Sequence, residues 1–202
     1  IAAADASTGW CLGQSLGCAR AAAFLPPESA HEIFDAPDTI VCWGAANVTA
    51  RAVVVEGGYQ VTGDWFFGSG IDNATWVGGH IPVVESDGSP RLDPGGKPTI
   101  RTMLWLRDQT IITDVWQVIG LLGTGSNAYS VDDIFVPDHH VFIRDAASDR
   151  RVDSPLYRIS LTQYYGVSFA GVALGIARPM LDDFIELARG KTARGTSRKL
   201  CE

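Results

Sequence analysis

The sequence has few cysteines and no cysteine arrangement that would organise a metal or a disulfide network. Its four cysteines, Cys11, Cys18, Cys42 and Cys201, include no CxxC pair, and no histidine stands at zinc-ligand spacing from any of them. We therefore expect neither a cysteine-based metal centre nor a disulfide framework. The thiols are predicted to be reduced and mostly buried, which is typical of a cytoplasmic protein.

The sequence is also short of positive charge. Lys and Arg number 16 against 23 Asp and Glu, which gives a net charge of -7. Proteins that bind nucleic acids cluster Lys and Arg to neutralise phosphates, so this balance argues against a nucleic-acid partner. The basic cluster from Lys191 to Lys199 is expected to be a solvated loop.

Two further absences concern targeting and membranes. The chain begins at Ile1 without an initiator Met or a secretory leader, so we expect it to be a piece of a longer protein. Residues 159–177 carry no charge, which raises the question of a membrane span. However, side chains such as Ser160, Thr162 and Gln163 make the run too polar for lipid, and its small residues favour tight helix packing inside protein. We predict no membrane-spanning segment.

What is present falls into three textures along the chain. Residues 1–34 are rich in Ala and are predicted to form two helical pieces separated at Pro26-Pro27. From Ile40 to about Ile143, short β-branched and aromatic runs alternate with Gly, Pro and Asp, the pattern of an antiparallel sheet or barrel. Residues 156–190 are predicted to be helical, with Pro179 either kinking the helix or starting a second one.

The middle region predicts individual strands. Runs 51–56 and 60–67 flank Gly57-Gly58, and glycines supply the positive φ that a tight hairpin turn requires. Further strands are predicted at 76–84, 100–106, 111–119 and 129–136, with an exposed loop at 85–98. The predicted fold class is α+β and multidomain: the end of an N-terminal helical domain (1–36), an antiparallel β-barrel or sandwich (37–146), and the first helices of an incomplete C-terminal helical bundle (147–202).

Two local motifs suggest ligand sites that the surrounding sequence does not support. The segment from Gly123 to Ala128 fits GxGxxA, but a helix follows the dinucleotide-binding turn, whereas 129–137 has the pattern of a strand. A turn of this kind could still hold an oxygen-rich group through N–H groups and hydroxyls, or be a plain turn. At His139-His140, adjacent side chains on an extended chain point apart and no third ligand has suitable spacing, so we predict no metal.

The stretch GDWFFGSGIDNATWVGG, from Gly63 to Gly79, combines two Trp and two Phe with five Gly. One interpretation is a sandwich core with a glycine-rich turn, because aromatics commonly fill such cores. The other is a platform for a large flat cofactor, in which an aromatic side chain packs against the ring, Ser69 bonds its polar edge, and Gly68 and Gly70 let the backbone approach closely. Composition leaves both open.

The order of elements and three motifs together resemble the acyl-CoA dehydrogenase superfamily over nearly the whole chain. DASTGW (5–10), EGGYQVTGDWFFGSG (56–70) and ITDVWQVIGLLGTGSNAYSVDDIFVP (112–137) follow one another in the family's order. The hairpin is most similar to the GGYxVxGxWxFxSG pattern of two-component (group D) flavin-dependent monooxygenases, which use reduced flavin from a separate reductase. Two departures from the dehydrogenases are Trp65, where they usually carry Lys, and segment 42–52, which lacks the usual Pro.

By this resemblance the chain carries part of a flavin site. Phe67 and Ser69 fall where the family places an aromatic and a hydroxyl against the flavin ring, Trp65 shares a strand face with Phe67, and Phe66 faces the other way. Donors in the loop at 124–126 could stabilise charge on reduced flavin. Asp114 and Trp116 match a supporting element before that loop. The implied cofactor-binding residues are Phe67, Gly68, Ser69, Gly70, Thr124, Gly125 and Ser126, and the candidate substrate contacts are Asn47 and Trp65.

The resemblance implies an enzyme that uses flavin, either FMN or FAD, to hydroxylate an aromatic or other apolar small molecule with O2. It also implies a homotetramer, and a catalytic residue that lies outside this chain in the rest of the C-terminal helical domain. Two alternatives stay open. One is an acyl-CoA dehydrogenase that oxidises the CH–CH bond of a CoA thioester, and the other is a non-catalytic β-module that binds a hydrophobic partner.

Overall fold

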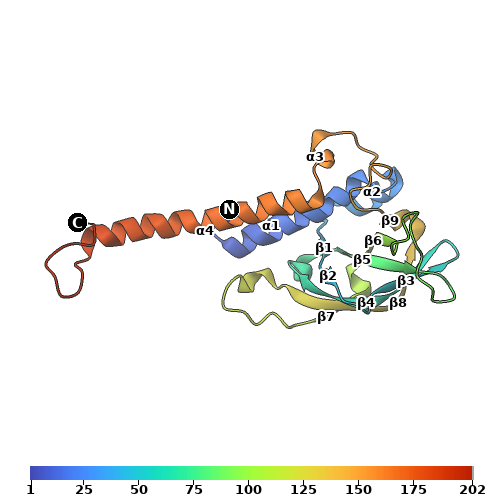
Figure 1. Ribbon diagram of the computed structural model, residues 1–202, viewed down its shortest axis with the longest axis horizontal. Helices are drawn as coiled ribbons and strands as arrows, with labels where there is room; N and C mark the ends of the chain where they lie inside the picture. The colour runs from blue at the N-terminus through green and yellow to red at the C-terminus, as the bar shows by residue number, and fades with distance from the viewer. Residues whose placement is uncertain (202) are drawn as a thin grey trace.

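A computed structural model describes residues 1–201, and it separates a helical part from a β part (Figure 1). Helices α1 and α4 lie side by side, the sheet lies to one side of them, and α2 follows α1 and lies over the sheet. The α-helices are α1 (Ala6–Ala19), α2 (Pro27–Phe34), α3 (Pro155–Arg158) and α4 (Leu161–Gly190). Short 3-10 turns are η1 (Arg20–Ala23), η2 (Ile71–Asn73), η3 (Arg107–Gln109), η4 (Leu122–Thr124) and η5 (Asp138–His140).

The first two helices begin at residues whose local chemistry suits a helix start, and α2 begins at Pro27 as the sequence predicts. The Asp5 side chain caps α1 by accepting a hydrogen bond of 2.6 Å from the Thr8 N–H, which satisfies one of the free donors of the first turn. Pro27 occupies the first turn of α2, where its missing N–H costs nothing. The predicted break at Pro26-Pro27 is confirmed.

The sheet is mixed, with the strand order β7-β8-β4-β3-β5-β6-β9, while β1 pairs with β5 and β2 with β4. The strands are β1 (Val41–Trp43), β2 (Ala45–Ala46), β3 (Arg51–Val55), β4 (Gly58–Gly68), β5 (Trp76–Val84), β6 (Ile100–Leu106), β7 (Ile111–Thr113), β8 (Asn127–Pro137) and β9 (Val141–Phe142). The hairpin between β3 and β4 turns at Gly57, whose φ is 76°, as predicted. The predicted bounds of β5 and β6 are also confirmed.

The expectation of a purely antiparallel sheet is wrong. Strand β5 runs parallel to both β1 and β3. After the β3–β4 hairpin the chain crosses to the far side of β3, so the next strand lies beside β3 and has the same direction. Strand β7 is also shorter than predicted, because the chain leaves the sheet after Thr113. A closed barrel or a sandwich stays a prediction.

The β part has an aromatic core, and Trp65 lies at its centre. The Trp65 ring has no exposed surface and stacks on Tyr129 at 5.3 Å between ring centroids, with Trp105 at 5.4 Å. A Cβ at Gly79 would lie 2.5 Å from the indole nitrogen of Trp65, so glycine is needed there for the ring to fit. This burial corrects the expectation that Trp65 contacts substrate, because no surface of its side chain is accessible.

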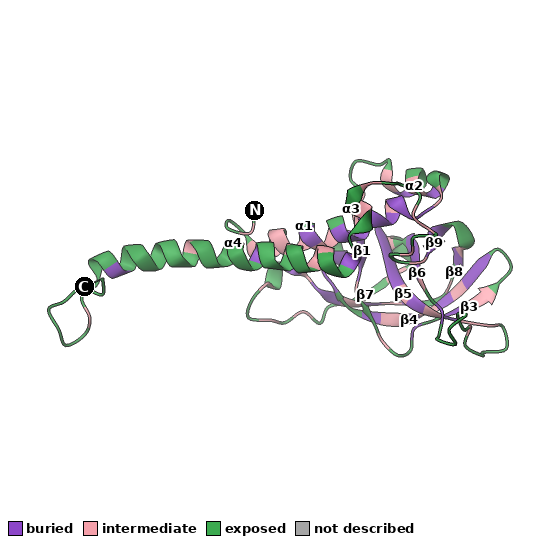
Figure 2. Cartoon of the chain, turned by 45° about the horizontal axis from the view of Figure 1, so that its top comes forward, coloured by how far each residue is buried: buried purple, intermediate pink, exposed green. Residues whose placement is uncertain are grey.

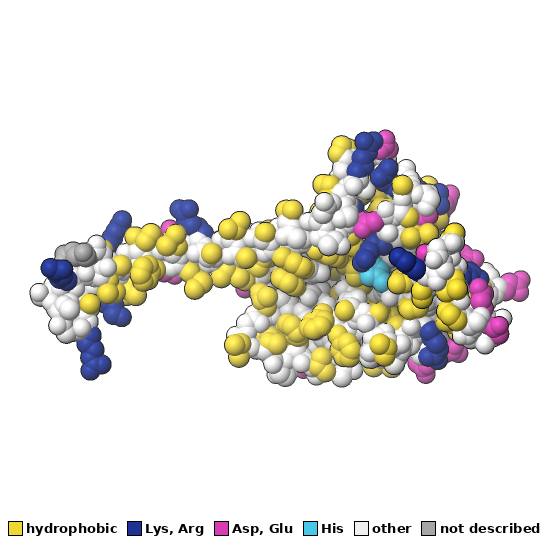
Figure 3. Space-filling view, viewed as in Figure 1, with side chains coloured by type: hydrophobic (Ala, Val, Ile, Leu, Met, Phe, Trp, Pro, Cys, Tyr) yellow, Lys and Arg dark blue, Asp and Glu magenta, His cyan; other side chains and the backbone are white. Residues whose placement is uncertain are grey.

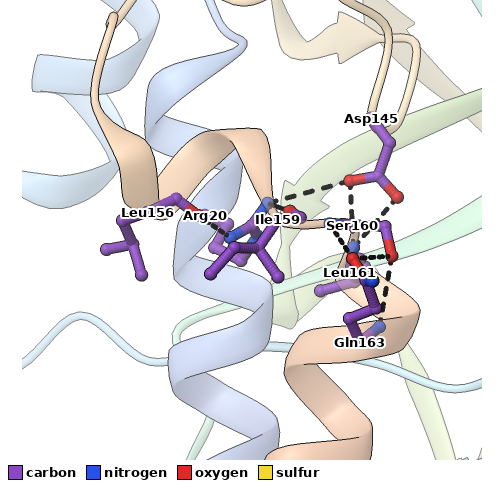
Figure 4. A network of polar contacts seen from close by, with 7 residues as sticks. All are labelled: Arg20, Asp145, Leu156, Ile159, Ser160, Leu161 and Gln163. Carbon is purple, nitrogen blue, oxygen red and sulfur yellow. Dashed lines mark hydrogen bonds and ion pairs between the residues drawn. The ribbon is translucent and has the colours of Figure 1, made fainter.

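A buried arginine ties the beginning of α4 to the first helical segment (Figure 4). Arg20 is 5% exposed and donates hydrogen bonds to the carbonyl groups of Leu156 at 2.7 Å and Ile159 at 2.6 Å. Its guanidinium also lies 3.8 Å from a carboxylate oxygen of Asp145, which itself accepts from the N–H of Leu161. These charge-assisted bonds fix the point at which α4 starts.

Helix α4 packs on α1 near its start and then extends away from the rest of the chain (Figure 1). The close approach of the two helices depends on two glycines of α1. A Cβ at Gly13 would overlap the Ser168 hydroxyl, and one at Gly17 would overlap the Tyr165 ring. The helix continues through Pro179, so no second helix starts there. In Figure 2 most of its outer length is exposed, and Figure 3 shows apolar side chains along it. Within the described residues Gly166 and Gly171 have open space around them, so tight packing at these two small residues stays a prediction.

Two absences in the structure concern cysteines and membranes. Cys11, Cys18, Cys42 and Cys201 are all free thiols, and of these Cys18 and Cys42 are buried. Burial raises the pKa of Cys18 to about 12 and raises that of Cys42 well above its ordinary value, so these thiols stay protonated. Among residues 1–201, no helix combines the length and the apolar character needed to cross a membrane.

Candidate functional site

The end of β4 departs from regular strand geometry at Phe67. Strand β4 pairs Trp65 with Tyr129 and Gly68 with Asn127, so three steps along β4 match two along β8, which is a β-bulge. Phe67 has a φ of 61°, a costly conformation for a bulky residue. Phe66 is 42% exposed and Phe67 is 61% exposed. The predicted alternation, with Phe67 on the Trp65 face, is wrong because the bulge turns Phe67 to the surface.

The exposed Phe67 ring belongs to an apolar surface, which we call the aromatic ledge, made by Phe67 and Trp116, with exposed Leu122 next to the residue that Trp116 binds. The edge of Trp116 meets Phe67 at 6.1 Å and 86°, and the Trp116 indole donates a hydrogen bond of 3.0 Å to the Leu121 carbonyl. Leu122 is 59% exposed. The stretch from Gly63 to Gly79 thus supplies both core and surface: Trp65 fills the core, whereas Phe67 faces outward. A cofactor platform at Phe67 stays a prediction.

Behind the ledge, four side chains form a directed row of hydrogen bonds, which we call the hydroxyl row: Trp10, Ser69, Ser126 and Thr124. The Trp10 indole N–H donates to Ser69 Oγ at 3.0 Å, Ser69 and Ser126 hydroxyls lie 2.7 Å apart, and Ser126 and Thr124 hydroxyls lie 2.7 Å apart. Thr124 Oγ1 donates to the Leu121 carbonyl at 2.9 Å.

The direction of this row follows from proton count, because each hydroxyl has one O–H. Thr124 gives its proton to a carbonyl, so it accepts from Ser126, and Ser126 in turn accepts from Ser69. All three hydroxyl groups belong to buried residues. The row therefore has no spare O–H donor while it is intact, and a ligand must either donate to it or displace one of its bonds.

Backbone geometry brings the two predicted loops together. The Gly70 N–H donates to the Thr124 carbonyl at 2.8 Å, and Gly70 has a φ of 80°. Gly125 has a φ of 48°, and a Cβ there would lie 2.6 Å from Asp72 Oδ2. The structure thus places together the seven residues predicted to bind cofactor, Phe67, Gly68, Ser69, Gly70, Thr124, Gly125 and Ser126. Their role in binding stays a prediction.

A cavity of about 690 Å³ opens beside the hydroxyl row. It runs along one face of α1, and Gly70 and Gly123 line the end nearest the row. The other lining residues are Asp5, Ser7, Thr8, Cys11, Leu12, Ser15, Leu16, Ala19, Phe34, Thr39, Ile40, Val41 and Asn73. Its size suits a small aromatic molecule. Sequence reasoning assigned no site role to this face of α1 or to Trp10. The DASTGW motif, residues 5–10, was the signal that could have identified them.

Asn47, the other candidate substrate contact, has structural partners. Its amide donates to Asp64 Oδ1 at 2.8 Å, and the Thr49 hydroxyl donates to the other oxygen of the same carboxylate. The hydrogen bonds from Thr49 and then Asn47 lower the pKa of Asp64. Asn47 therefore holds the segment before β3 against β4, and a substrate contact stays a prediction.

His80 lies away from the predicted site residues and is held neutral. Burial, and then the charge of Arg144, lower its pKa to about 3. Arg144 donates to His80 Nε2 at 3.0 Å, so the ring proton lies on Nδ1 and is donated to Thr102 Oγ1 at 2.8 Å.

The chain is similar to oxygenase components along almost its entire length. It is 31% identical over 203 residues to the FADH(2)-dependent resorcinol hydroxylase oxygenase component of Rhizobium sp., a match that covers 96% of this chain and 48% of the relative. It is 33% identical over 192 residues to indole-3-acetate monooxygenase of Pseudomonas putida, with 95% and 46% covered. The chain thus spans about half the length of these curated relatives. No protein-family model matches it.

Solved structures of similar proteins share the fold of this chain over nearly its whole length. XiaF from Streptomyces sp., in complex with FADH2 and glycerol, superposes with a TM-score of 0.83 at 25% identity, covering 98% of this chain and 50% of that one. The 3-HSA hydroxylase from Rhodococcus sp. RHA1 gives 0.82 at 28% identity, covering 100% and 52%.

The fold and the motifs together define an acyl-CoA dehydrogenase-like chain. Within that class its homologues are oxygenase components of two-component flavin-dependent monooxygenases, and the predicted resemblance to this branch is confirmed.

Proposed function

We propose that the protein is the oxygenase component of a two-component monooxygenase, which binds reduced flavin and hydroxylates an aromatic or other apolar small molecule with O2. The observation that carries this proposal is the exposed Phe67 ring, held outward by a bulge and backed by the hydroxyl row. Bound flavin supplies the redox chemistry, and the chain supplies the surface that orients it.

The residues fit a flat cofactor in two ways. The aromatic ledge offers an exposed apolar face, and the hydroxyl row presents acceptor lone pairs. In this proposal the flavin ring lies on Phe67 with its polar edge towards Ser69, Thr124 and Ser126. Either FMN or FAD suits this surface.

The substrate, in this proposal, enters the cavity beside α1. The apolar side chains of Leu12 and Leu16 line it, and the Cys11 thiol lies on the same face. Burial, and then the nearby Asp5 charge, raise the pKa of Cys11, which keeps that thiol protonated and uncharged. An apolar pocket also excludes water from the reacting oxygen, which limits wasteful loss of the oxidant.

Assembly and location are also proposals. Exposed apolar residues on the outer half of α4, among them Met180, Leu181 and Phe184, favour burial against further helices, as in a homotetramer. Four free thiols favour a cytoplasmic location, where a flavin reductase would be the partner. Light scattering on the purified intact protein measures the subunit number directly, and a monomer would contradict the assembly proposal.

The test is flavin binding by the purified intact protein and two wall variants under anaerobic conditions. Phe67→Ala and Ser69→Ala are each expected to weaken binding of reduced flavin by about tenfold, which corresponds to about 1.4 kcal/mol. Phe135→Ala is the matched control, because Phe135 is an exposed phenylalanine near the other end of β8. Circular dichroism checks that each variant is folded. Unchanged affinity in both wall variants would refute the site.

A cavity variant separates substrate from cofactor. Leu12→Trp narrows the cavity beside α1 without touching Phe67 or the hydroxyl row. It is expected to raise the KM for an aromatic substrate while leaving flavin affinity unchanged. Loss of flavin affinity in this variant would place the cofactor, instead of the substrate, in the cavity.

A further inference from the structure

Three potential metal ligands from two distant parts of the chain meet at the edge of the β part. Glu32 belongs to α2, and His139 and His140 belong to η5, directly after β8. One ligand atom from each of the three lies within 4.8 Å of the others. His140 Nε2 and Glu32 Oε2 are 3.0 Å apart.

The prediction that adjacent histidines point apart rested on an extended backbone. The chain instead forms a 3-10 turn at Asp138–His140, and the two imidazole rings lie 4.5 Å apart between centroids. The third group, Glu32, is far away in sequence and is brought in by the packing of α2. Sequence spacing alone could not have found it.

We propose that Glu32, His139 and His140 form a binding site for a divalent transition-metal ion of the zinc type. Two imidazole nitrogens and one carboxylate oxygen are a known zinc ligand set, and water completes the tetrahedron. Ligands at about 2.0 to 2.1 Å from a tetrahedral ion lie about 3.3 Å from one another. The His140–Glu32 pair is already close to that spacing, and only the exposed His139 side chain must move inward.

One ligand is rigid and two are accessible, an arrangement that admits an ion from solvent. His140 is 7% exposed, and its ring packs edge-on against Trp76 at 5.2 Å between centroids. Glu32 and His139 are exposed. The ion would link α2 to the end of β8 and so stabilise the junction between the helical and β parts.

This site is independent of the proposed flavin surface. Strand β8 starts at Asn127, opposite Gly68, and ends at Pro137, opposite Gly58. At about 3.3 Å per residue the two sites lie about 30 Å apart along the strand. A metal here would therefore act on stability and leave flavin affinity unchanged.

The experiment uses tag-free protein that has been treated with a chelator and dialysed. Zn2+ is titrated in competition with a chromophoric chelator, and Co2+ is added separately to record its absorption spectrum. One Zn2+ per chain, a higher thermal midpoint with Zn2+, and Co2+ bands of tetrahedral intensity are expected.

Two variants at exposed positions and one matched control decide the assignment. Glu32→Gln and His139→Ala are each expected to weaken Zn2+ binding by at least about tenfold. Mutation of residues that only support a metal ligand already lowers metal affinity about 10- to 100-fold, and a ligand itself should matter at least as much. His31→Ala is the control, because exposed His31 lies beside Asp35 on α2 and could bind metal weakly by itself. No saturable binding, equal binding in wild type and both variants, or a loss confined to His139→Ala would each overturn the three-ligand site.

Discussion

The bond between Trp10 and Ser69 connects α1 to the hydroxyl row, and Trp10→Phe tests its strength. The substitution removes the indole N–H that donates to Ser69 Oγ at 3.0 Å. It retains an aromatic ring that can stack on Phe169, which lies 4.5 Å from the Trp10 ring at an angle of 5°. Because a neutral hydrogen bond contributes about 1 kcal/mol, we expect the free energy of unfolding to fall by about that amount.

Ser69→Ala should cost more, about 2 kcal/mol, because it removes the same bond, breaks the link to Ser126, and leaves the Trp10 N–H without its partner. In the double variant that N–H is also gone, so the total should again be about 2 kcal/mol. A double-mutant cycle from urea unfolding would then give a coupling energy of about 1 kcal/mol. Strict additivity would refute the row as we describe it.

Three other predictions concern positions outside the ledge. Arg20→Met should lower the free energy of unfolding, measured in urea, by about 3 kcal/mol, because two carbonyl groups lose a charged donor. Arg20→Lys keeps a charged donor and should retain part of that stabilisation. Because the pKa of His80 is lowered to about 3, the unfolded state binds the extra proton, so stability should fall as pH drops from 6.5 towards 3. His80→Gln should flatten that pH dependence, and an unchanged slope would contradict a neutral ring. Gly125→Ala should lower the free energy of unfolding by about 1 to 2 kcal/mol in the same assay, because the φ of Gly125 is 48° and the new Cβ would lie against Asp72. An unchanged free energy of unfolding would show that the loop adjusts.

The sequence predicts regular elements well because local chemistry determines them. Short β-branched and aromatic runs divided by turn residues gave the bounds of β5 and β6, and Gly57 with its positive φ marked the first hairpin. Pro27 marked the beginning of α2 for a similarly local reason.

The errors concern features that depend on pairing between distant segments. Phe67 leaves the strand face because β4 has one residue more than β8 between two ladder positions, which strand periodicity cannot reveal. The parallel placement of β5 depends on which side of β3 the chain returns to. Trp10 joins Ser69 across 59 positions of sequence, so only the folded chain shows the hydroxyl row.

The proximity of the candidate site residues was predicted, whereas their hydrogen-bond directions were not. Resemblance of the 56–70 and 112–137 motifs to one family brought the two loops into a single hypothesis, and the Gly70–Thr124 backbone bond shows that they meet. The donor role expected of the Thr124 and Ser126 hydroxyls changes, because the Thr124 proton goes to the Leu121 carbonyl and the Ser126 proton goes to Thr124.

The central claim is that this surface holds reduced flavin for monooxygenation, and stopped-flow absorbance tests it most directly. Purified intact protein is preloaded anaerobically with reduced flavin and mixed with oxygenated buffer, in parallel with the Ser126→Ala variant. We predict a transient spectrum distinct from both reduced and oxidised flavin, shorter-lived in the variant. Direct return of the oxidised spectrum with no transient, together with bleaching of oxidised flavin by acyl-CoA esters, would contradict the account and indicate a dehydrogenase.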